Sequence, residues 1–167
     1  MLGSAFCMAT SATAVAAAWS LKPVTAHASF FNWGKSPAAP EPYRQNRIYF
    51  PVRYESEFEP LLLLKTPLLA NFTFRGDPKS DKLTGAFSRI VSEETEFRVS
   101  AVDVEADEQG TRELLVRYSV TELPMIVAFR GGVPYAKFTL PKDFTKDSEI
   151  DWIALKAWIE SVADKPL

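Results

Sequence analysis

The most regular hydrophobic pattern in this 167-residue chain predicts an amphipathic helix that begins at Pro78. Apolar side chains recur at the i, i+3, i+4, i+7 and i+8 spacing of one helix face, namely Leu83, Ala86, Phe87, Ile90 and Val91. Proline suits the first helical position because its missing N–H has no partner there, and Asp77 before it is a good N-cap. We therefore expect residues 75–80 to form a loop that leads directly into a half-buried helix.

Runs of apolar and β-branched residues predict the strands. Residues 68–74 are apolar enough to form a strand buried on both faces, in which Asn71 is the one polar side chain that faces the core. Residues 48–54 suit an edge strand, because Pro51 cannot donate to a ladder. Further strands are predicted over 97–104, 125–129 and 135–140, the last two joined by a hairpin turn at Gly131-Gly132.

Shorter helical segments separate or follow these strands. Ser56 and Glu59 form a capping-box pattern ahead of the apolar run 61–64. Two more helices are predicted, over 111–118 after an acidic loop at 103–108, and over 151–163 after a cap at Ser148 or Asp151. The order β-α-β-α-β-α-β-β-α indicates an α/β domain with a central mixed sheet of four to five strands flanked by helices.

Residues 1–34 differ from the rest of the chain and are expected to be a targeting segment or membrane anchor. They contain no acidic residue, which favours mitochondrial targeting, while the triplet Ala26-His27-Ala28 leaves a secretory signal peptide as the alternative. Residues 1–21 are uncharged and long enough to associate with the inner membrane. The prolines in residues 35–47 predict an extended linker, which leaves residues 48–167 for the folded domain.

The composition of the chain restricts the partners and the reactions that are open to the predicted domain. All 21 acidic residues follow residue 40, and no stripe of basic residues with interleaved aromatics is present, so nucleic acid is not the expected partner. Cys7 and His27 are unique and precede the predicted domain, which excludes intrachain disulfides and Cys–His or Ser–His catalysis within it. We expect no cofactor and no metal site. Four carboxylates are interpreted as a solvated loop, because they lack a calcium-loop pattern: Asp103, Glu105, Asp107 and Glu108.

The element order and several segments resemble the thioredoxin family. Residues 65–72 look like the strand that leads to the thioredoxin active site, and residues 102–107 look like its third strand and acidic turn. Residues 118–125 resemble the segment that holds the family's cis-proline, here Pro124, and Gly131-Gly132 fits the hairpin that follows. The resemblance covers residues 48–163 and implies the thioredoxin fold.

The same resemblance implies a redox-inactive member. Where thioredoxins carry Cys-x-x-Cys, this sequence has Asp77, Pro78, Lys79 and Ser80, and the family's buried acid corresponds to Asn71. Thiol exchange requires a thiolate, which none of these residues supplies. The structural interpretation makes Asp77 a helix cap and Ser80 a solvated residue of the first turn. The alternative is a glutathione-dependent or peroxiredoxin-like enzyme that uses the Ser80 hydroxyl.

The segment around Pro124 is a family feature that survives the loss of the cysteines. A cis-proline there would leave the backbone groups of Leu123 free to pair with an extended peptide, although Pro124 also serves to set the loop geometry. Trp158 is a second candidate contact, with packing against the sheet edge as its alternative role. We therefore expect a non-enzymatic mitochondrial binding or assembly protein whose partner is a protein or an extended peptide. A third hypothesis is an oxidoreductase subunit that acts with a partner's thiol or with Cys7.

Overall fold

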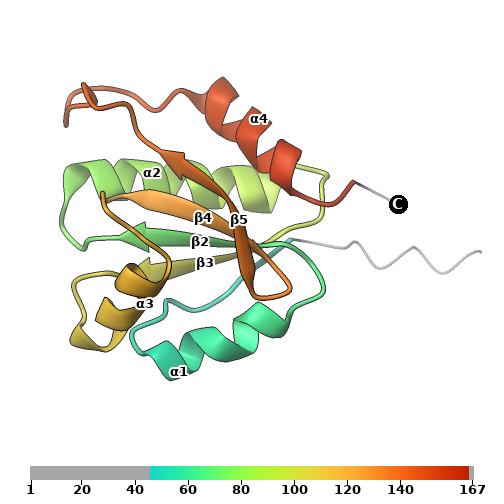
Figure 1. Ribbon diagram of the computed structural model, residues 1–167. Helices are drawn as coiled ribbons and strands as arrows, with labels where there is room; N and C mark the ends of the chain where they lie inside the picture. Colours follow the sequence, from blue (N-terminus) through green and yellow to red (C-terminus); the bar gives the residue numbers. More distant parts are fainter. Residues whose placement is uncertain (1–45, 166–167) are drawn as a thin grey trace, which may run out of the picture. The chain divides into compact units, whose positions relative to one another are not determined.

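The computed structural model describes residues 46–165, which form a five-stranded sheet in the order β1-β3-β2-β4-β5 (Figure 1). The strands are β1 (Arg47–Ile48), β2 (Leu68–Thr73), β3 (Ser100–Glu105), β4 (Met125–Arg130) and β5 (Val133–Thr139). β1 and β2 run parallel to β3, β4 runs antiparallel to β2, and β5 runs antiparallel to β4. The mixed sheet confirms the predicted α/β class.

Helices cover both faces of the sheet. They are α1 (Glu55–Phe58) with the 3-10 helix η1 (Glu59–Leu63), α2 (Pro78–Arg89) with the π-helical extension η2 (Ile90–Glu94), α3 (Arg112–Arg117) preceded by the 3-10 helix η3 (Gln109–Thr111), and α4 (Trp152–Val162). Figure 1 shows α2 and α4 on one face and α1 and α3 on the other. The element order is the one that the hydrophobic pattern predicts.

β2 lies between two hydrophobic cores, because alternate side chains of a strand point to opposite faces. Leu69 packs among residues of α2 and α4, whereas Phe72 packs among residues of α1 and α3. In the second core the rings of Phe58, Tyr118 and Phe129 meet edge to face, with centroids 4.7 to 5.8 Å apart. All six residues of β2 are buried, which confirms its prediction as a central strand.

The first strand is shorter than the predicted span 48–54. Its ladder with β3 covers Arg47–Ile48, and a single bridge from Val52 to Val104 continues the pairing further along. Pro51 lies between the two and has no N–H to donate, so the ladder cannot run through it. The predicted effect of this proline is confirmed, but the strand begins and ends earlier than expected.

The cap of the first helix also differs from the prediction. Oε2 of Glu57 accepts hydrogen bonds from the backbone N–H groups of Arg53 and Tyr54, at 2.8 and 3.2 Å. The helix therefore begins at Glu55, and the predicted pair of Ser56 and Glu59 is wrong by two residues, since Tyr54 and Glu57 take these positions. Ser56 lies inside the helix instead of before it.

Asn46 explains why the third strand begins at Ser100 rather than at residue 97. Its Nδ2, which carries two N–H groups, lies 2.9 to 3.3 Å from three backbone carbonyl oxygens that share them, those of Val91, Thr95 and Phe97. Its Oδ1 accepts the N–H of Val99 at 3.0 Å. One side chain thus satisfies backbone groups that a neighbouring strand would otherwise pair.

Among residues 46–165, no helix is both long and apolar enough to cross a bilayer. The predicted targeting segment 1–34, most of the linker 35–47, and both Cys7 and His27 lie outside the described residues.

Candidate functional site

The degenerate loop connects the end of β2 to the start of α2. Gly76 has a φ of +77°, a left-handed conformation that glycine adopts without strain. Oδ2 of Asp77 accepts the N–H of Ser80 at 3.0 Å, and Pro78 occupies the first turn of the helix. Asp77 is therefore the N-cap of α2, as predicted. Lys79 is half-buried in the same turn.

Ser80 is fully buried, so its interpretation as a solvated residue is wrong. Its hydroxyl donates to Oδ2 of Asp77 at 3.0 Å and accepts the backbone N–H of Phe74 at 3.2 Å. These bonds tie the first turn of α2 to the end of β2 and to the N-cap. We call the group formed by Phe74, Asp77 and Ser80 the polar clasp. Both hydrogen-bonding directions of the Ser80 hydroxyl are used within it.

The acid Asp103 lies beside Asn71, and sequence reasoning missed this contact. Asn71 is fully buried, and its Nδ2 donates to Oγ1 of Thr84 and to Oδ1 of Asp103, each at 2.8 Å. Oδ1 of Asn71 has no hydrogen-bond partner among the described residues. Burial raises the pKa of Asp103 above its ordinary value, and the hydrogen bond from Asn71 opposes this rise. The sequence signal that could have indicated this contact is the position of Asp103 between Val102 and Val104 in the predicted strand 97–104.

An ionic network with two arginines holds the other three acids of the predicted solvated loop, namely Glu105, Asp107 and Glu108. Glu105 is the last residue of β3 and is buried, with Arg53 at 2.9 Å and Arg75 at 3.4 Å from its Oε2. Arg75 also binds Asp107 at 2.8 Å and Glu108 at 2.5 Å. The interpretation of 103–108 as a solvated loop is therefore wrong for Asp103 and Glu105, which belong to β3. The network ties the loop before Asp77 to the start of α3.

Asp107 illustrates how this network holds its charges. Burial of its carboxylate disfavours ionisation, but the hydrogen bond and the positive charge of Arg75 outweigh it and lower the pKa of Asp107 below its ordinary value. Oγ1 of Thr111 donates to the backbone carbonyl of Glu105 at 2.7 Å, which holds the end of the loop against β3. The acids are thus paired with arginines or with polar side chains of the same domain.

Leu123 and Pro124 lie at the same end of the sheet as the polar clasp. The antiparallel pairing of β2 and β4 ends at Phe72 and Met125, and the peptide bond between Leu123 and Pro124 is cis. Two residues beyond the last pair, Phe74 and Leu123 expose 46% and 38% of their surfaces. Within the described residues, the N–H and C=O of Leu123 make no backbone hydrogen bond. Two exposed apolar residues, one of them with backbone groups that have no backbone partner in residues 46–165, therefore lie at this end of the sheet.

Trp158 belongs to a different part of the fold. It is half-buried on α4, and its ring packs against Phe138 of β5 with centroids 5.4 Å apart. This is the predicted alternative, packing against the edge of the sheet. The structure brings residues 77–80, Leu123 and Pro124 to one end of β2 and β4, while Trp158 holds α4 on the sheet.

Comparison with known proteins identifies the fold. No protein-family model matches the chain, and no curated protein matches it in sequence. Among solved structures, it is similar to a mutant thioredoxin from Halobacterium salinarum, with 20% identity, a TM-score of 0.55, and coverage of 72% of this chain and 95% of that chain. For thioredoxin O2 from Arabidopsis thaliana the identity is 20% and the TM-score 0.53, with coverage of 68% of this chain and 93% of that chain. For the thioredoxin of Malassezia sympodialis the identity is 15% and the TM-score 0.56, with coverage of 71% of this chain and 92% of that chain. The chain therefore has the thioredoxin fold.

Proposed function

We propose that this chain is a non-catalytic thioredoxin-fold binding or assembly protein that captures an extended segment of a protein partner beside Leu123. The observation that carries the proposal is that Leu123 is 38% exposed and its backbone groups have no backbone partner within the described residues, at the end of the sheet where Phe74 is also exposed. An extended segment binds such a surface by backbone hydrogen bonds, while its side chains contact the neighbouring apolar groups. The surface needs no reactive group to do so.

The chemistry of the polar clasp supports a role without catalysis. The two positions where the resemblance places cysteines hold Asp77 and Ser80, and neither supplies the thiolate that disulfide exchange requires. Asp77 is occupied as the helix cap, and Ser80 is buried with its hydroxyl bonded on both sides. A glutathione-dependent enzyme would need that hydroxyl exposed, so this alternative is disfavoured.

We also propose that the protein is mitochondrial, on the composition of residues 1–34. A fluorescent protein fused behind residues 1–47 tests this directly, and intact-mass measurement of the recovered chain shows whether Cys7 remains. Colocalisation with a mitochondrial marker is the expected result. Delivery to the secretory pathway would contradict it, and a retained Cys7 would revive the hypothesis of an oxidoreductase subunit.

Site-specific photo-crosslinking tests the binding surface. A photoreactive phenylalanine analogue replaces Leu123 in one variant and Ile153 in another. Ile153 is the matched control, because it is an apolar residue with 83% of its surface exposed but lies on α4. We expect a discrete adduct from position 123 that is absent from position 153.

The crosslinked partner segment is then synthesised as a peptide, and its affinity for the wild-type chain is measured. Leu123→Asp places a carboxylate on the proposed contact and should abolish binding, whereas Ile153→Asp should leave it unchanged. Equal labelling from both positions, or equal affinity of both variants, would refute the proposal. Disulfide reduction by the wild-type chain would refute its non-catalytic part.

A further inference from the structure

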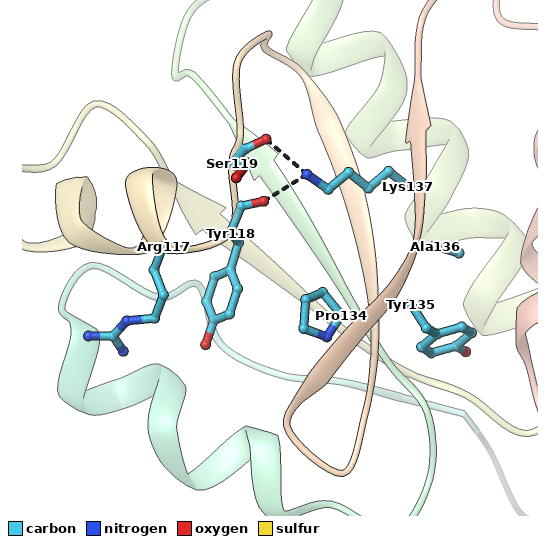
Figure 2. A pocket seen from close by; sticks show the side chains of 7 residues that line it. All are labelled: Arg117, Tyr118, Ser119, Pro134, Tyr135, Ala136 and Lys137. Carbon is cyan, nitrogen blue, oxygen red and sulfur yellow. Dashed lines mark hydrogen bonds between the residues drawn. The ribbon is translucent and has the colours of Figure 1, made fainter.

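A pocket lies between the end of α3 and the edge strand β5, on the face of the sheet that carries α1 and α3 (Figure 2). Its volume is about 370 Å³, and seven residues line it, namely Arg117, Tyr118, Ser119, Pro134, Tyr135, Ala136 and Lys137. This volume is near the lower end of the range for ligand pockets, roughly 300 to 1,000 Å³. The pocket therefore suits a side chain or another small group rather than a large cofactor.

The ammonium group of Lys137 is held at the top of the pocket. Its Nζ donates to the backbone carbonyls of Tyr118 at 2.8 Å and Ser119 at 2.9 Å, as Figure 2 shows. Lysine carries three N–H donors, so a third is available for a ligand. The two bonds fix a side chain that is otherwise flexible, and part of the entropic cost of ordering it is already met before a ligand arrives.

The charge of Lys137 is not matched by an acid. No Asp or Glu is among the lining residues, and within the described residues Lys137 forms no salt bridge. Arg117 also lines the pocket but is paired with Glu55. The pocket therefore offers one unneutralised cation that is already positioned. A carboxylate is the complementary group.

Two rings line the pocket below this cation, those of Tyr118 and Pro134. Figure 2 shows the rings of Tyr118 and Pro134 on either side of the opening. The Tyr118 ring packs edge to face against Phe58 and Phe129, which prevents it from closing the space. A ligand with a short hydrocarbon stem that ends in a carboxylate matches both features. Glutamate and aspartate side chains have this form.

The pocket is close enough to Leu123 for one extended segment to contact both. Loop 119–123 connects them directly, and Lys137 pairs with Val127, which lies four residues after Leu123. At about 3.3 Å per residue, four residues of strand correspond to roughly 13 Å. We propose that the pocket binds an acidic side chain of the partner segment, located about four residues from the part that contacts Leu123. The claim that this carboxylate belongs to the partner segment rests on the proposed function. The claim that the pocket binds a carboxylate does not.

The experiment follows backbone NMR signals of the ¹⁵N-labelled chain during titration with N-acetylglutamate α-amide, whose single carboxylate is on the side chain. The neutral control is N-acetylglutamine amide. We expect saturable shifts of Ser119 and Lys137 with the acid, at least about fivefold weaker binding with the neutral compound, and loss of the difference at high salt. A threonine-rich nonapeptide with one glutamate should shift these signals and that of Leu123 together.

Lys137→Met should remove the preference for the acid, while Lys82→Met should keep it. Lys82 is the matched control, because its Nζ also donates to a backbone carbonyl, that of Ser148, at 2.7 Å but outside the pocket. If Lys137→Met fails to fold, Ser119→Asp serves instead, since it places a competing carboxylate beside Lys137.

The two proposals fail in different ways. Absence of shifts with the small acid, or equal binding of acid and amide, overturns the carboxylate pocket even if the peptide still shifts Leu123. Shifts at the pocket with none at Leu123 for any peptide would overturn the shared segment and the proposed function, and would leave a site for small carboxylates. Loss of acid binding in Lys82→Met would also refute the role of Lys137.

Discussion

Asn71 on β2 donates a hydrogen bond from its Nδ2 to Oδ1 of Asp103 on β3, across 2.8 Å within the sheet. The amide is fully buried, and burial also raises the pKa of the carboxyl above its ordinary value of 3.8. An acid thus contacts Asn71 from β3, the strand next to the one where the resemblance places the family's buried acid. We therefore expect the stability of the domain to depend on pH.

The first prediction concerns this pH dependence. The folded chain holds the Asp103 proton more tightly than the unfolded chain, so the free energy of unfolding falls as pH rises from the ordinary pKa through the raised one. Above that window the contribution is constant. Asp103→Asn should remove this fall, because its amide oxygen still accepts from Asn71 without carrying a charge.

Urea unfolding of both proteins from about pH 4 to about pH 7 measures the effect. At neutral pH the variant should be as stable as the wild type or more stable, by up to about 1 kcal/mol. Asp147→Asn, at an exposed position, is the control and should reproduce the wild-type profile. A wild-type stability that rises through the window relative to Asp103→Asn would contradict the assignment.

The second prediction compares two helix caps. Asp77 and Asp151 each accept a hydrogen bond from the backbone N–H of the residue three positions later, at 3.0 and 2.9 Å. Only Asp77 also accepts a hydrogen bond from a buried hydroxyl, that of Ser80. Asp151→Ala should cost about 1 kcal/mol, the usual value for a lost cap. Asp77→Ala should cost about 2 to 3 kcal/mol, because the Ser80 hydroxyl also loses its acceptor. Equal losses in urea unfolding would show that the clasp adds nothing.

The third prediction concerns Asn46. Asn46→Ala removes the side-chain contacts to four backbone groups of residues 91–99 and should destabilise the domain by about 2 to 4 kcal/mol. Asn46→Asp keeps an acceptor for the Val99 N–H but loses the donors to three carbonyls, so it should be nearly as damaging. Hydrogen exchange should show faster exchange of the Val99 amide in the alanine variant. If the aspartate variant retains full stability, the donated bonds are unimportant.

The fourth prediction restores the missing cysteines. Asp77 and Ser80 already place side-chain oxygens 3.0 Å apart, so Asp77→Cys combined with Ser80→Cys should form a disulfide under mild oxidation. Mass spectrometry would detect the loss of two hydrogen atoms, and the reduced double variant should gain activity in an insulin-reduction assay. The wild-type chain and each single variant should remain inactive. A double variant that never oxidises would show that the loop geometry differs from that of a thiol-exchange site.

The parts of the fold that follow from local pattern could be predicted, and the parts that depend on distant partners could not. The cap at Asp77 and the buried strand around Asn71 are local features, and both are present as expected. Burial of Ser80 depends on how the loop returns to Phe74, and the contact of Asn71 with Asp103 depends on strand register. Periodicity along the chain carries neither of these relationships.

The other differences between the predicted and the observed structure arise from contacts between residues that are far apart in the sequence. Asn46 bonds to residues 45 to 53 positions away, and so it shortens the third strand without any local signal. Three of the acidic residues predicted to be solvated, Glu105, Asp107 and Glu108, are instead held by Arg53 and Arg75, and Arg53 is 52 residues from Glu105. Charge pattern alone does not distinguish a solvated loop from such a network.

Sulfur chemistry is nearly absent from the domain. Met125 is the one sulfur-containing residue among those the structure describes, and it is 4% exposed at the start of β4, directly after Pro124. Residues 46–165 therefore present no accessible sulfur to peroxide beside the polar clasp or beside Leu123. We expect this surface to keep the same shape and charge under oxidative stress and in reducing conditions, so that a partner held there would remain bound when thiol-dependent contacts elsewhere in its compartment are lost.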